Sequence, residues 1–255
     1  NLHPTEGYVV IGALPGLGEA AGLYHYAPRE HALERRADCR TLVYEALMHE
    51  FPAQAFLVGL SSIHWREAWK YGERAFRYCQ HDAGHAIGAL RIAAATLGWS
   101  ATLLHGLADE TIEDLLGLDR DEDFVGAERE HPVAVLSVWP TDVTGGGQAR
   151  THHGEPSRFD PVLAYPLTLE CWHGAANRLS RDDPVRWEVI DEVAAATRKP
   201  ASETQGCETI PTPGVERNGV ASDDGPLAGQ IILQRRSLQA CDRRTSITAA
   251  SFYRM

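Results

Sequence analysis

Apolar and β-forming residues concentrate in four short segments of the chain. Residues 6–14 (EGYVVIGAL) and 23–28 (LYHYAP) are separated by a Gly/Pro-rich turn, which predicts a hairpin with a long loop. Residues 55–62 (AFLVGLSS) are a short apolar run of the kind found in buried strands. Residues 131–139 (HPVAVLSVW) predict a further strand.

Helical patterns lie between and after these strands, and the longest of them is unusually apolar. Arg91 is the only formally charged side chain between residues 83 and 97, so we expect this helix to be buried in the centre of the protein or in an interface. Gly84 and Gly88 are costly in a helix interior, which predicts close backbone packing there. Asp109 is the expected cap of another helix. The other predicted helices cover residues 42–49, 109–116, 162–179 and 184–196.

The order of these elements favours one fold class. Strands and helices are interleaved without a regular βαβ period, and the first two strands form a hairpin. We therefore predict an α+β layered domain, not a doubly wound parallel sheet.

The composition changes after residue 139, where Gly, Pro and polar residues dominate. This predicts three parts: a domain over residues 1–139, a linker with helices over residues 140–225, and a further segment over residues 226–255. The chain starts with Asn1 and ends in an apparently interrupted helix, so we expect it to be part of a longer protein.

Charge and cysteine content narrow the functional classes. The formal net charge of -11 over 255 residues would repel a phosphate backbone, which argues against nucleic acid as a partner. Five scattered cysteines without a C-x-x-C pair indicate reduced thiols in a cytosolic protein. No apolar run approaches the roughly 20 residues that span a bilayer, so no membrane insertion is expected.

One candidate metal motif stands out. His81 and His85 are four residues apart with Asp82 between them, as in the H-E-x-x-H zinc helix with Asp in place of Glu. A zinc site needs a third ligand, and nothing singles out one further histidine. Paired histidines on a helix of small residues are more often packed in a core, so we predict no metal here and keep a metal-dependent hydrolase as an alternative. The possible third ligands are His105, His131, His152, His153 and His173.

Just before this motif, Lys70 and Tyr71 lie among aromatic residues (HWREAWKYGERAFRY). A lysine with restricted solvation has a lowered pKa and can transfer protons, with a neighbouring phenol as its partner. The alternative is an amphipathic surface helix with solvated Arg66, Lys70, Glu73 and Arg74, and from the residues alone this alternative is favoured.

Two further segments could bind a ligand. Arg235, Arg236 and Ser237 offer two guanidinium groups and a hydroxyl to a phosphate, although such clusters are usually only solvated. Residues 1–6 (NLHPTE) lead directly into a strand, and Asn1 and His3 could hydrogen-bond a heterocycle edge. An ordinary turn is the alternative for this segment.

These segments, in this order, resemble the SagB-type dehydrogenase branch of the nitroreductase superfamily. The resemblance rests on NLHPTEGYVVIGALPGL, GLYHYAPREHALE, FLVGLSSIHWREAWKYGERAFRYCQHDAGHAIGALRIAAATLGW and HPVAVLSV, and it covers residues 1–139. It implies a nitroreductase-like fold with a mainly antiparallel sheet flanked by helices. It also implies FMN as cofactor, bound at an interface between two such units.

The resemblance also implies functional roles for several residues. LQRRSLQACDRRTSITAASFYRM is similar to the start of a nitroreductase domain, which implies a second unit beginning within residues 226–255 and bound in cis, or a homodimer. It implies that Arg235, Arg236 and Ser237 hold the FMN phosphate, that Asn1 and His3 approach the flavin ring, and that Lys70 and Tyr71 transfer protons.

The expected activity is hydride transfer between a substrate and FMN. The branch implies a peptide azoline as substrate, whereas the wider superfamily implies a nitro compound or quinone and NAD(P)H. A catalytically silent scaffold with the same fold is the remaining alternative.

Overall fold

The computed structural model describes residues 2–104, 106–140, 171–178, 186–200, 226–237 and 240–249. The chain divides into two compact units, residues 1–203 and 204–255. In the described part of the second unit, one helix is formed, α6 (Ala228–Gln234). All other named elements belong to the first unit.

The first unit is built on a six-stranded sheet of order β3-β2-β1-β4-β6-β5. Each neighbouring pair is antiparallel, which confirms the predicted mainly antiparallel α+β architecture. The predicted hairpin and the two further predicted strands are all present. The strands are β1 (Thr5–Ile11), β2 (Gly22–Ala27), β3 (Ala32–Asp38), β4 (Phe56–Ser62), β5 (Trp99–Leu103) and β6 (His131–Pro140).

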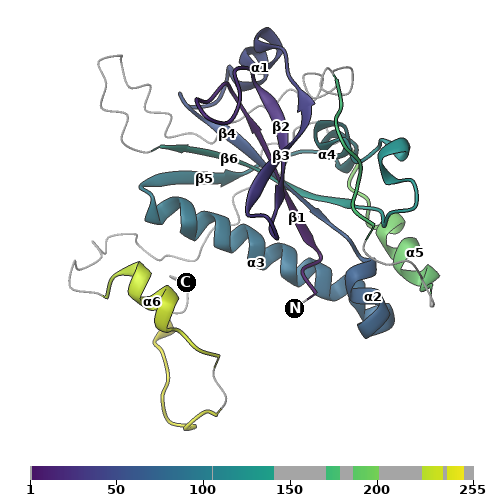
Figure 1. Cartoon of the computed structure of the whole chain (residues 1–255). Helices are drawn as coiled ribbons and strands as arrows, with labels where there is room; N and C mark the ends of the chain where they lie inside the picture. The colour runs from purple at the N-terminus through teal and green to yellow at the C-terminus, as the bar shows by residue number, and fades with distance from the viewer. Residues whose placement is uncertain are drawn as a thin grey trace. The chain divides into compact units, whose positions relative to one another are not determined.

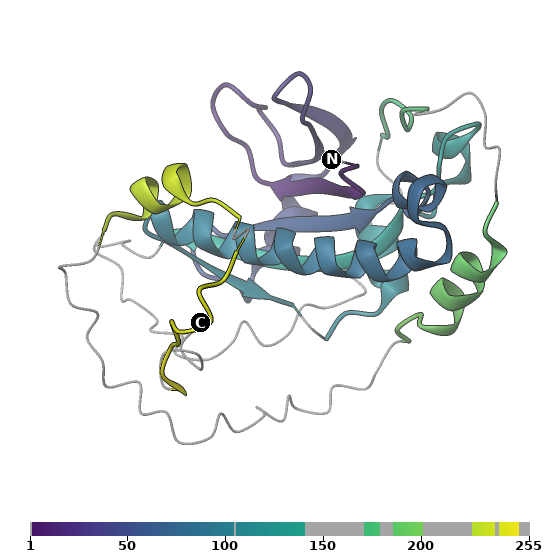
Figure 2. The same cartoon turned by 90° about the horizontal axis from the view of Figure 1, so that it is seen from below.

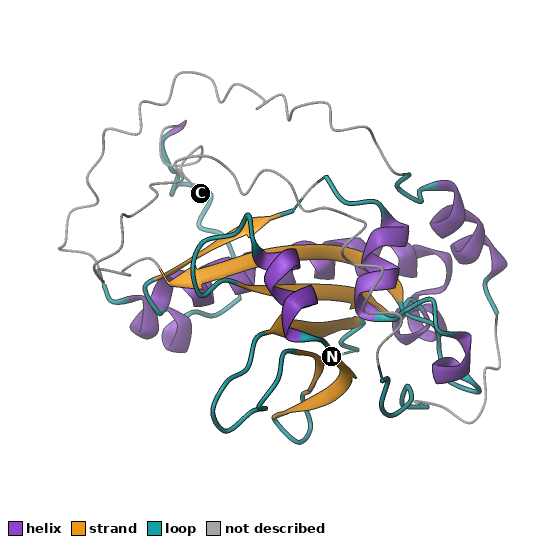
Figure 3. Ribbon diagram, turned by 90° about the horizontal axis from the view of Figure 1, so that it is seen from above, coloured by secondary structure: helices purple, strands orange, loops and turns teal. Residues whose placement is uncertain are grey.

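Helices cover both faces of this sheet (Figure 3). The long helix α3 lies along one face, over β4, β6 and β5, whereas α1 and α4 lie on the other (Figures 1 and 2). The helices of the first unit are α1 (Thr41–Met48), α2 (Trp65–Tyr71), α3 (Ala75–Thr96), α4 (Asp109–Leu116) and α5 (Glu188–Ala196).

The main core lies between the sheet and α4. Tyr8 and Val10 alternate with outward residues along β1 and point into this core, as period-two patterning requires. Leu115 and Leu116 of α4 are fully buried against them. Gly59 of β4 makes room for α4, because a Cβ there would lie 2.5 Å from the Leu116 side chain.

Helix α3 is buried on one face only in the described chain, so it does not lie in the centre of the protein, and its expected place in an interface stays a prediction. Ala75, Cys79, Ala83 and Ala94 face the unit's interior, while the opposite side is open. We call His81, His85, Gly88 and Ile92, at helical spacings of four, three and four, the outward stripe of α3; the first, second and fourth are exposed and Gly88 is half-buried.

The close backbone packing expected at Gly84 and Gly88 is also absent. A Cβ at either position would meet nothing within 4 Å in the described chain.

The predicted helix over residues 162–179 is not formed in its described part, residues 171–178. Trp172 instead makes an antiparallel bridge with Ala37 at the edge of β3. The backbone N–H of Asp38 donates to the carbonyl of Cys171, and that of His173 donates to the carbonyl of Arg36. Pairing to an open strand edge therefore outweighs the local helical pattern.

The expected cap of α4 is also different. The N-cap residue is Ala108, and it makes no side-chain cap. Asp109 begins the helix, and its carboxylate accepts a hydrogen bond of 2.9 Å from the backbone N–H of Lys199. Asp109 thus ties α4 to the segment after α5.

Cys39, Cys79, Cys171 and Cys241 form no disulfide bond in the described chain, and Cys207 lies outside it. Of the helices that the structure describes, none is both long and apolar enough to cross a membrane.

Two stacked histidines join α2 to β6. The rings of His64 and His131 are 4.0 Å apart and nearly parallel, and Phe76 meets the His64 ring edge-on. Burial and the neighbouring His131 lower the pKa of His64 to about 3. Burial also lowers the pKa of His131. Both rings are therefore neutral in the folded protein near pH 7.

We predict that this pair makes the fold acid-sensitive. The unfolded chain binds a proton at His64 below about pH 6.5 while the folded protein does not, so the free energy of unfolding falls by roughly 1.4 kcal/mol per pH unit below that value. Urea unfolding between pH 7.5 and 4.5 should show a shallower loss in His64→Phe than in the wild type. The exposed His49→Phe is the control. Parallel pH profiles of wild type and His64→Phe would contradict this prediction.

Candidate active site

A cavity of about 540 Å³ opens between the N-terminal segment, α2 and α3. It has the size usual for small-molecule sites. It brings together His3, Lys70 and Tyr71, which the sequence singled out separately. The lining residues are Leu2, His3, Pro4, Thr5, Glu67, Lys70, Tyr71, Tyr78, Asp82, His85 and Ala86.

Helix α2 presents Glu67, Lys70 and Tyr71 to the cavity at positions i, i+3 and i+4, which share one helix face. The Lys70 ammonium lies 5.1 Å from the centre of the Tyr71 ring. The Tyr71 ring in turn tilts against Tyr78 of α3, with centroids 4.7 Å apart. Lys70 is exposed in this chain, so the restricted solvation considered for it is not present in the described structure.

Glu67 is a member of the site that sequence reasoning missed. Its side chain is 5% exposed, and it faces the cavity with Lys70 and Asp82. Burial and the charge of Asp82 raise the pKa of Glu67, although Lys70 opposes the shift. The spacing from Glu67 to Lys70 is the signal that could have indicated a shared face.

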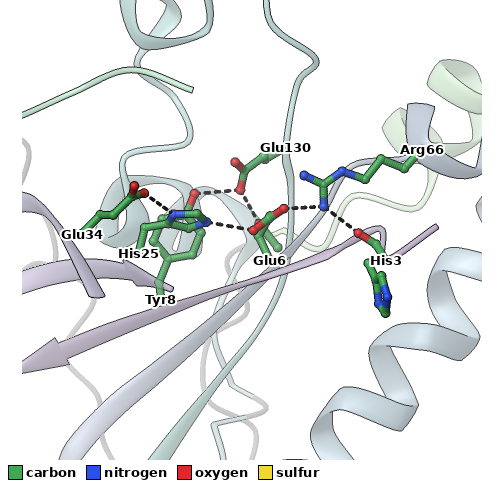
Figure 4. Close-up of polar contacts among 8 residues, drawn as sticks. His3, Glu6, Tyr8, His25, Glu34, Arg66 and Glu130 are labelled. Atoms are coloured by element: carbon green, nitrogen blue, oxygen red, sulfur yellow. Dashed lines mark hydrogen bonds and ion pairs between the residues drawn. The ribbon is translucent and has the colours of Figure 1, made fainter. Parts of the chain in front are cut away.

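The N-terminal segment forms the opposite wall of the cavity. His3 has a φ of +46°, in the left-handed region that non-glycine residues seldom adopt. Arg66 Nη1 donates a 2.6 Å hydrogen bond to the His3 carbonyl (Figure 4). The backbone N–H of Ile63 donates to the carbonyl of buried Pro4 at 2.7 Å. These two contacts attach the wall to the start of α2.

A polar network lies behind this wall, on the sheet face that packs against α4 (Figure 4). Strand register creates it, because Tyr8 of β1 stands opposite His25 of β2, and His25 stands opposite Glu34 of β3. His25 Nε2 is 2.8 Å from Glu6 Oε2, and its Nδ1 is 3.0 Å from Glu34 Oε2. Glu6 also forms an ion pair with Arg66.

Within this network, the contact between Glu6 and His25 shifts their pKa values in opposite directions. Burial alone would raise the pKa of Glu6, but the hydrogen bond from His25 and the charge of Arg66 lower it. Burial would lower the pKa of His25, but its bonds to Glu6 and Glu34 raise it. The pair therefore favours a carboxylate beside an imidazolium.

Glu130 completes the network without a cationic hydrogen-bond partner in the described chain. The Tyr8 hydroxyl donates to Glu130 Oε2 at 2.8 Å, and the Ser61 hydroxyl donates to the same oxygen. Burial raises the pKa of Glu130 despite these two bonds. Burial and Glu130 raise the pKa of Tyr8 well above its usual range.

The candidate zinc motif is divided by the structure. Asp82 and His85 line the cavity, whereas His81 does not. His131 is stacked on His64, and His173 lies 3.4 Å from Asp38. His105, His152 and His153 lie outside the described residues. In the described ranges, no three His, Cys, Asp or Glu side chains are grouped so as to hold a metal ion.

The expected phosphate-binding residues belong to the second unit. Arg235, Arg236 and Ser237 are exposed, and Arg236 Nη1 donates to the carbonyls of Arg235 and Leu233. Two guanidinium groups beside a hydroxyl are a suitable donor set for a phosphate. Asn1, expected near the flavin ring, lies outside the described residues.

Thr5 adds an observation that favours a ligand in the cavity. It lines the cavity, and its Oγ1 is buried without a hydrogen-bond partner in the described chain. An unsatisfied buried hydroxyl costs roughly 1–3 kcal/mol. The cavity size, this hydroxyl and the Lys70–Tyr71 pair are compatible with a bound heterocycle such as a flavin ring.

Comparison with known proteins identifies the fold. Residues 15–128 match the model of the nitroreductase family. The chain also aligns with a crystal structure from Anabaena variabilis, provisionally named a nitroreductase, at a TM-score of 0.50 and 23% identity, over 80% of this chain and 37% of the other. The described chain therefore has a nitroreductase-like fold, and the stretch similar to the nitroreductase family covers less than half of its length.

Two curated proteins are similar in sequence. MJ1384 of Methanocaldococcus jannaschii, named provisionally as a nitroreductase, is 26% identical over 140 residues, covering 53% of this chain and 65% of MJ1384. The trifolitoxin-processing protein TfxB of Rhizobium leguminosarum bv. trifolii is 31% identical over 126 residues, covering 46% of this chain and 33% of TfxB. The chain thus spans less than two thirds of either relative.

We predict that Thr5→Val raises the free energy of unfolding by about 1 kcal/mol, because it replaces an unsatisfied buried hydroxyl with a methyl group that suits a strand. Urea unfolding of the ligand-free protein measures the change. Thr102→Val, at a half-buried position of β5, is the matched control and should change the free energy less. A destabilised Thr5→Val protein would show instead that the hydroxyl is satisfied.

Proposed function

We propose that the protein is an FMN-dependent oxidoreductase of the nitroreductase type, with its active site in the cavity between residues 2–5, α2 and α3. The observation that carries the proposal is the convergence of His3, Lys70 and Tyr71 in one cavity of a nitroreductase-like fold. The family match over residues 15–128 supports an oxidoreductase.

FMN, when bound, would supply the ring that exchanges a hydride with the substrate. The residues of this chain then have to position the substrate and move the accompanying proton. Tyr71 offers a phenol and Lys70 an amine on the same side of the cavity, within reach of a shared ligand. In an oxidation, the proton released beside the reacting carbon would pass to Lys70 as the free amine or to Tyr71 as the phenolate, since only these deprotonated forms can accept it.

Two classes of substrate are proposed as alternatives. A peptide azoline, oxidised to an azole, is the substrate that the SagB-type branch implies, and the similarity to a trifolitoxin-processing protein supports this class. The similarity to MJ1384 supports the other class, a nitro compound or quinone reduced with NAD(P)H. The open cavity suits either, since its lining mixes carboxylate, ammonium and aromatic groups.

A second nitroreductase-type unit is the proposed partner. The outward stripe of α3 is open to solvent, and His85 belongs both to this stripe and to the cavity lining. A unit packed on α3 would therefore also close the cavity and desolvate Lys70.

We propose that this unit is supplied in cis or by a homodimer, and that the protein acts in the cytoplasm. The proposed division into a first domain at residues 1–139, a linker at 140–225 and the start of a second domain at 226–255 fits the cis arrangement. Arg235, Arg236 and Ser237 would then hold the FMN phosphate of the second unit.

Substitution of the proposed proton-transfer residues tests the function. We predict that Lys70→Ala and Tyr71→Phe each lower the rate of hydride exchange in the full-length protein about a hundredfold, because positioned acid–base groups contribute on that order. Stopped-flow absorbance of the flavin in a single turnover measures this rate. Tyr26→Phe, at an exposed tyrosine outside the cavity, is the matched control. Unchanged rates in both variants would remove the proposed proton transfer by Lys70 and Tyr71, whereas a wild-type protein without measurable hydride exchange would favour a silent scaffold.

A charge on the outward stripe tests the proposed partner. Ile92 is 58% exposed in this chain, so Ile92→Glu should fold normally but weaken packing of a second unit. We predict a smaller sedimentation coefficient or a more extended cis arrangement, together with lower flavin content. Val125→Glu, at a loop position that is 84% exposed, is the matched control. An unchanged sedimentation profile and flavin content would exclude this face as the interface.

A further inference from the structure

Arg66 connects the cavity wall to the network on the other side of the sheet. Along β1, Thr5 faces the cavity while Glu6, the next residue, points to the opposite face. The Arg66 guanidinium contacts both sides, because it donates to the His3 carbonyl at 2.6 Å and forms an ion pair with Glu6 (Figure 4). Arg66 lies on α2, one turn before Lys70. Arg66 therefore links the N-terminal wall of the cavity to α2.

The segment that Arg66 holds needs such a contact. His3 adopts a left-handed backbone conformation that costs about 1 kcal/mol or more and is stable only when neighbouring contacts impose it. Besides Arg66, the hydrogen bond from the Ile63 N–H to the Pro4 carbonyl and the pairing of Thr5 with Ser62 hold this wall. Of these contacts, the one from Arg66 is made to His3 itself.

Arg66 is itself held by a chain of charges. Glu6 accepts from both Arg66 and His25, and His25 lies between Glu6 and Glu34. Both ring nitrogens of His25 face carboxylate oxygens, and only the imidazolium form has an N–H on each nitrogen. The side chains of Glu6, Arg66 and His25 are all less than a fifth exposed, so these pairs are only partly screened by water.

We propose that Arg66 is a positioning residue of the active site, which holds the wall formed by residues 2–5 against α2, and that Glu6 and His25 hold Arg66 in place. The catalytic part of this inference rests on the proposed oxidoreductase function, whereas the positioning of the wall can be tested without it. The proposal assigns Arg66 no contact with substrate or cofactor.

Hydrogen–deuterium exchange of the full-length protein tests the positioning directly. Arg66→Met should speed exchange of the amides of Leu2, His3 and Thr5, the residues of this wall that carry an N–H, about ten- to hundredfold, as expected for losing two charge-assisted contacts, while β4 and β6 in the core exchange as in the wild type. Arg66→Lys keeps the positive charge but loses the planar set of guanidinium N–H donors, so it should increase the exchange rate less than Arg66→Met does. Arg29→Met, at a guanidinium that is 93% exposed, is the matched control.

Glu6→Gln provides a second variant that keeps Arg66 and its packing. It should also speed exchange of residues 2–5, because the ion pair that aligns the guanidinium is lost. If Arg66→Met does not fold, this variant decides the question.

The pH dependence is a readout that a merely structural contact would not give. The groups facing His25 are Glu6 and Tyr8 of β1, Glu34 of β3, and Glu130 before β6, with Arg36, Arg66 and Glu128 lining the same small cavity. The pKa of His25 is raised, so its contribution is present below about pH 6.5 and is lost as the pH rises through the raised value. Exchange of residues 2–5, corrected for the intrinsic rate, should accelerate over that range in the wild type and change less in His25→Gln.

Measurements of enzyme activity test the catalytic part of the proposal. If the protein is the proposed oxidoreductase, Arg66→Met should lower kcat/KM about tenfold or more with flavin still bound, and Arg29→Met should not. Wild-type exchange rates at residues 2–5 in both Arg66→Met and Glu6→Gln would overturn the proposal even in an active enzyme. Faster exchange in a protein without flavin or turnover would support the positioning and contradict only the proposed function.

Discussion

The ion pair between Glu6 and Arg66 adds a side-chain link between β1 and α2 to the backbone pairing of β1 with β4. Glu6 belongs to a central strand and points into the face covered by α4, whereas Arg66 belongs to the helix that carries Lys70 and Tyr71. A buried carboxylate is costly unless charged donors satisfy it. Glu6 has two such donors, Arg66 and His25, and both are fixed by strand register or by a short helix directly after a strand.

The contacts of Glu6 and Arg66 connect the interior of the sheet to the cavity beside α2. The sheet aligns Glu6, His25 and Glu34 across three strands, and the resulting row of charges ends at Arg66. From there the guanidinium reaches the His3 carbonyl and sets one wall of the cavity. Helix α3 supplies another wall and leaves its outward stripe open in the described chain, which is the observation behind our proposal of a second unit as partner.

Part of the fold could be predicted from the sequence, because some elements carry their own pattern. The strands β1, β2, β4 and β6 are apolar or β-branched along their length, and α4 has a clear amphipathic period. The strand β3 has no such pattern, since its residues (ALERRAD) are mostly charged, and pairing with β2 alone makes it a strand. For α3, the apolar sequence predicted burial either in the centre of the protein or in an interface, and one exposed face in the described chain argues against the first of these.

The candidate site likewise has residues that could be predicted from the sequence and residues that could not. Lys70, Tyr71 and His3 could be proposed because they lie in segments that resemble a known family, and the structure places all three in one cavity. The link from Arg66 to Glu6 and His25 could not, because it depends on strand register and on residues 19 and about 60 positions apart in the chain. The sequence pattern groups Arg66 with solvated side chains, whereas its side chain is largely buried and contacts both Glu6 and the His3 carbonyl.

The central claim is that the protein uses a flavin, and the visible absorbance spectrum of the purified full-length protein tests it most directly. We predict the visible absorbance of a bound flavin and FMN as the chromophore released on denaturation. A colourless protein that cannot be reconstituted with FMN would contradict the account, and stoichiometric zinc in such a protein would favour the hydrolase alternative.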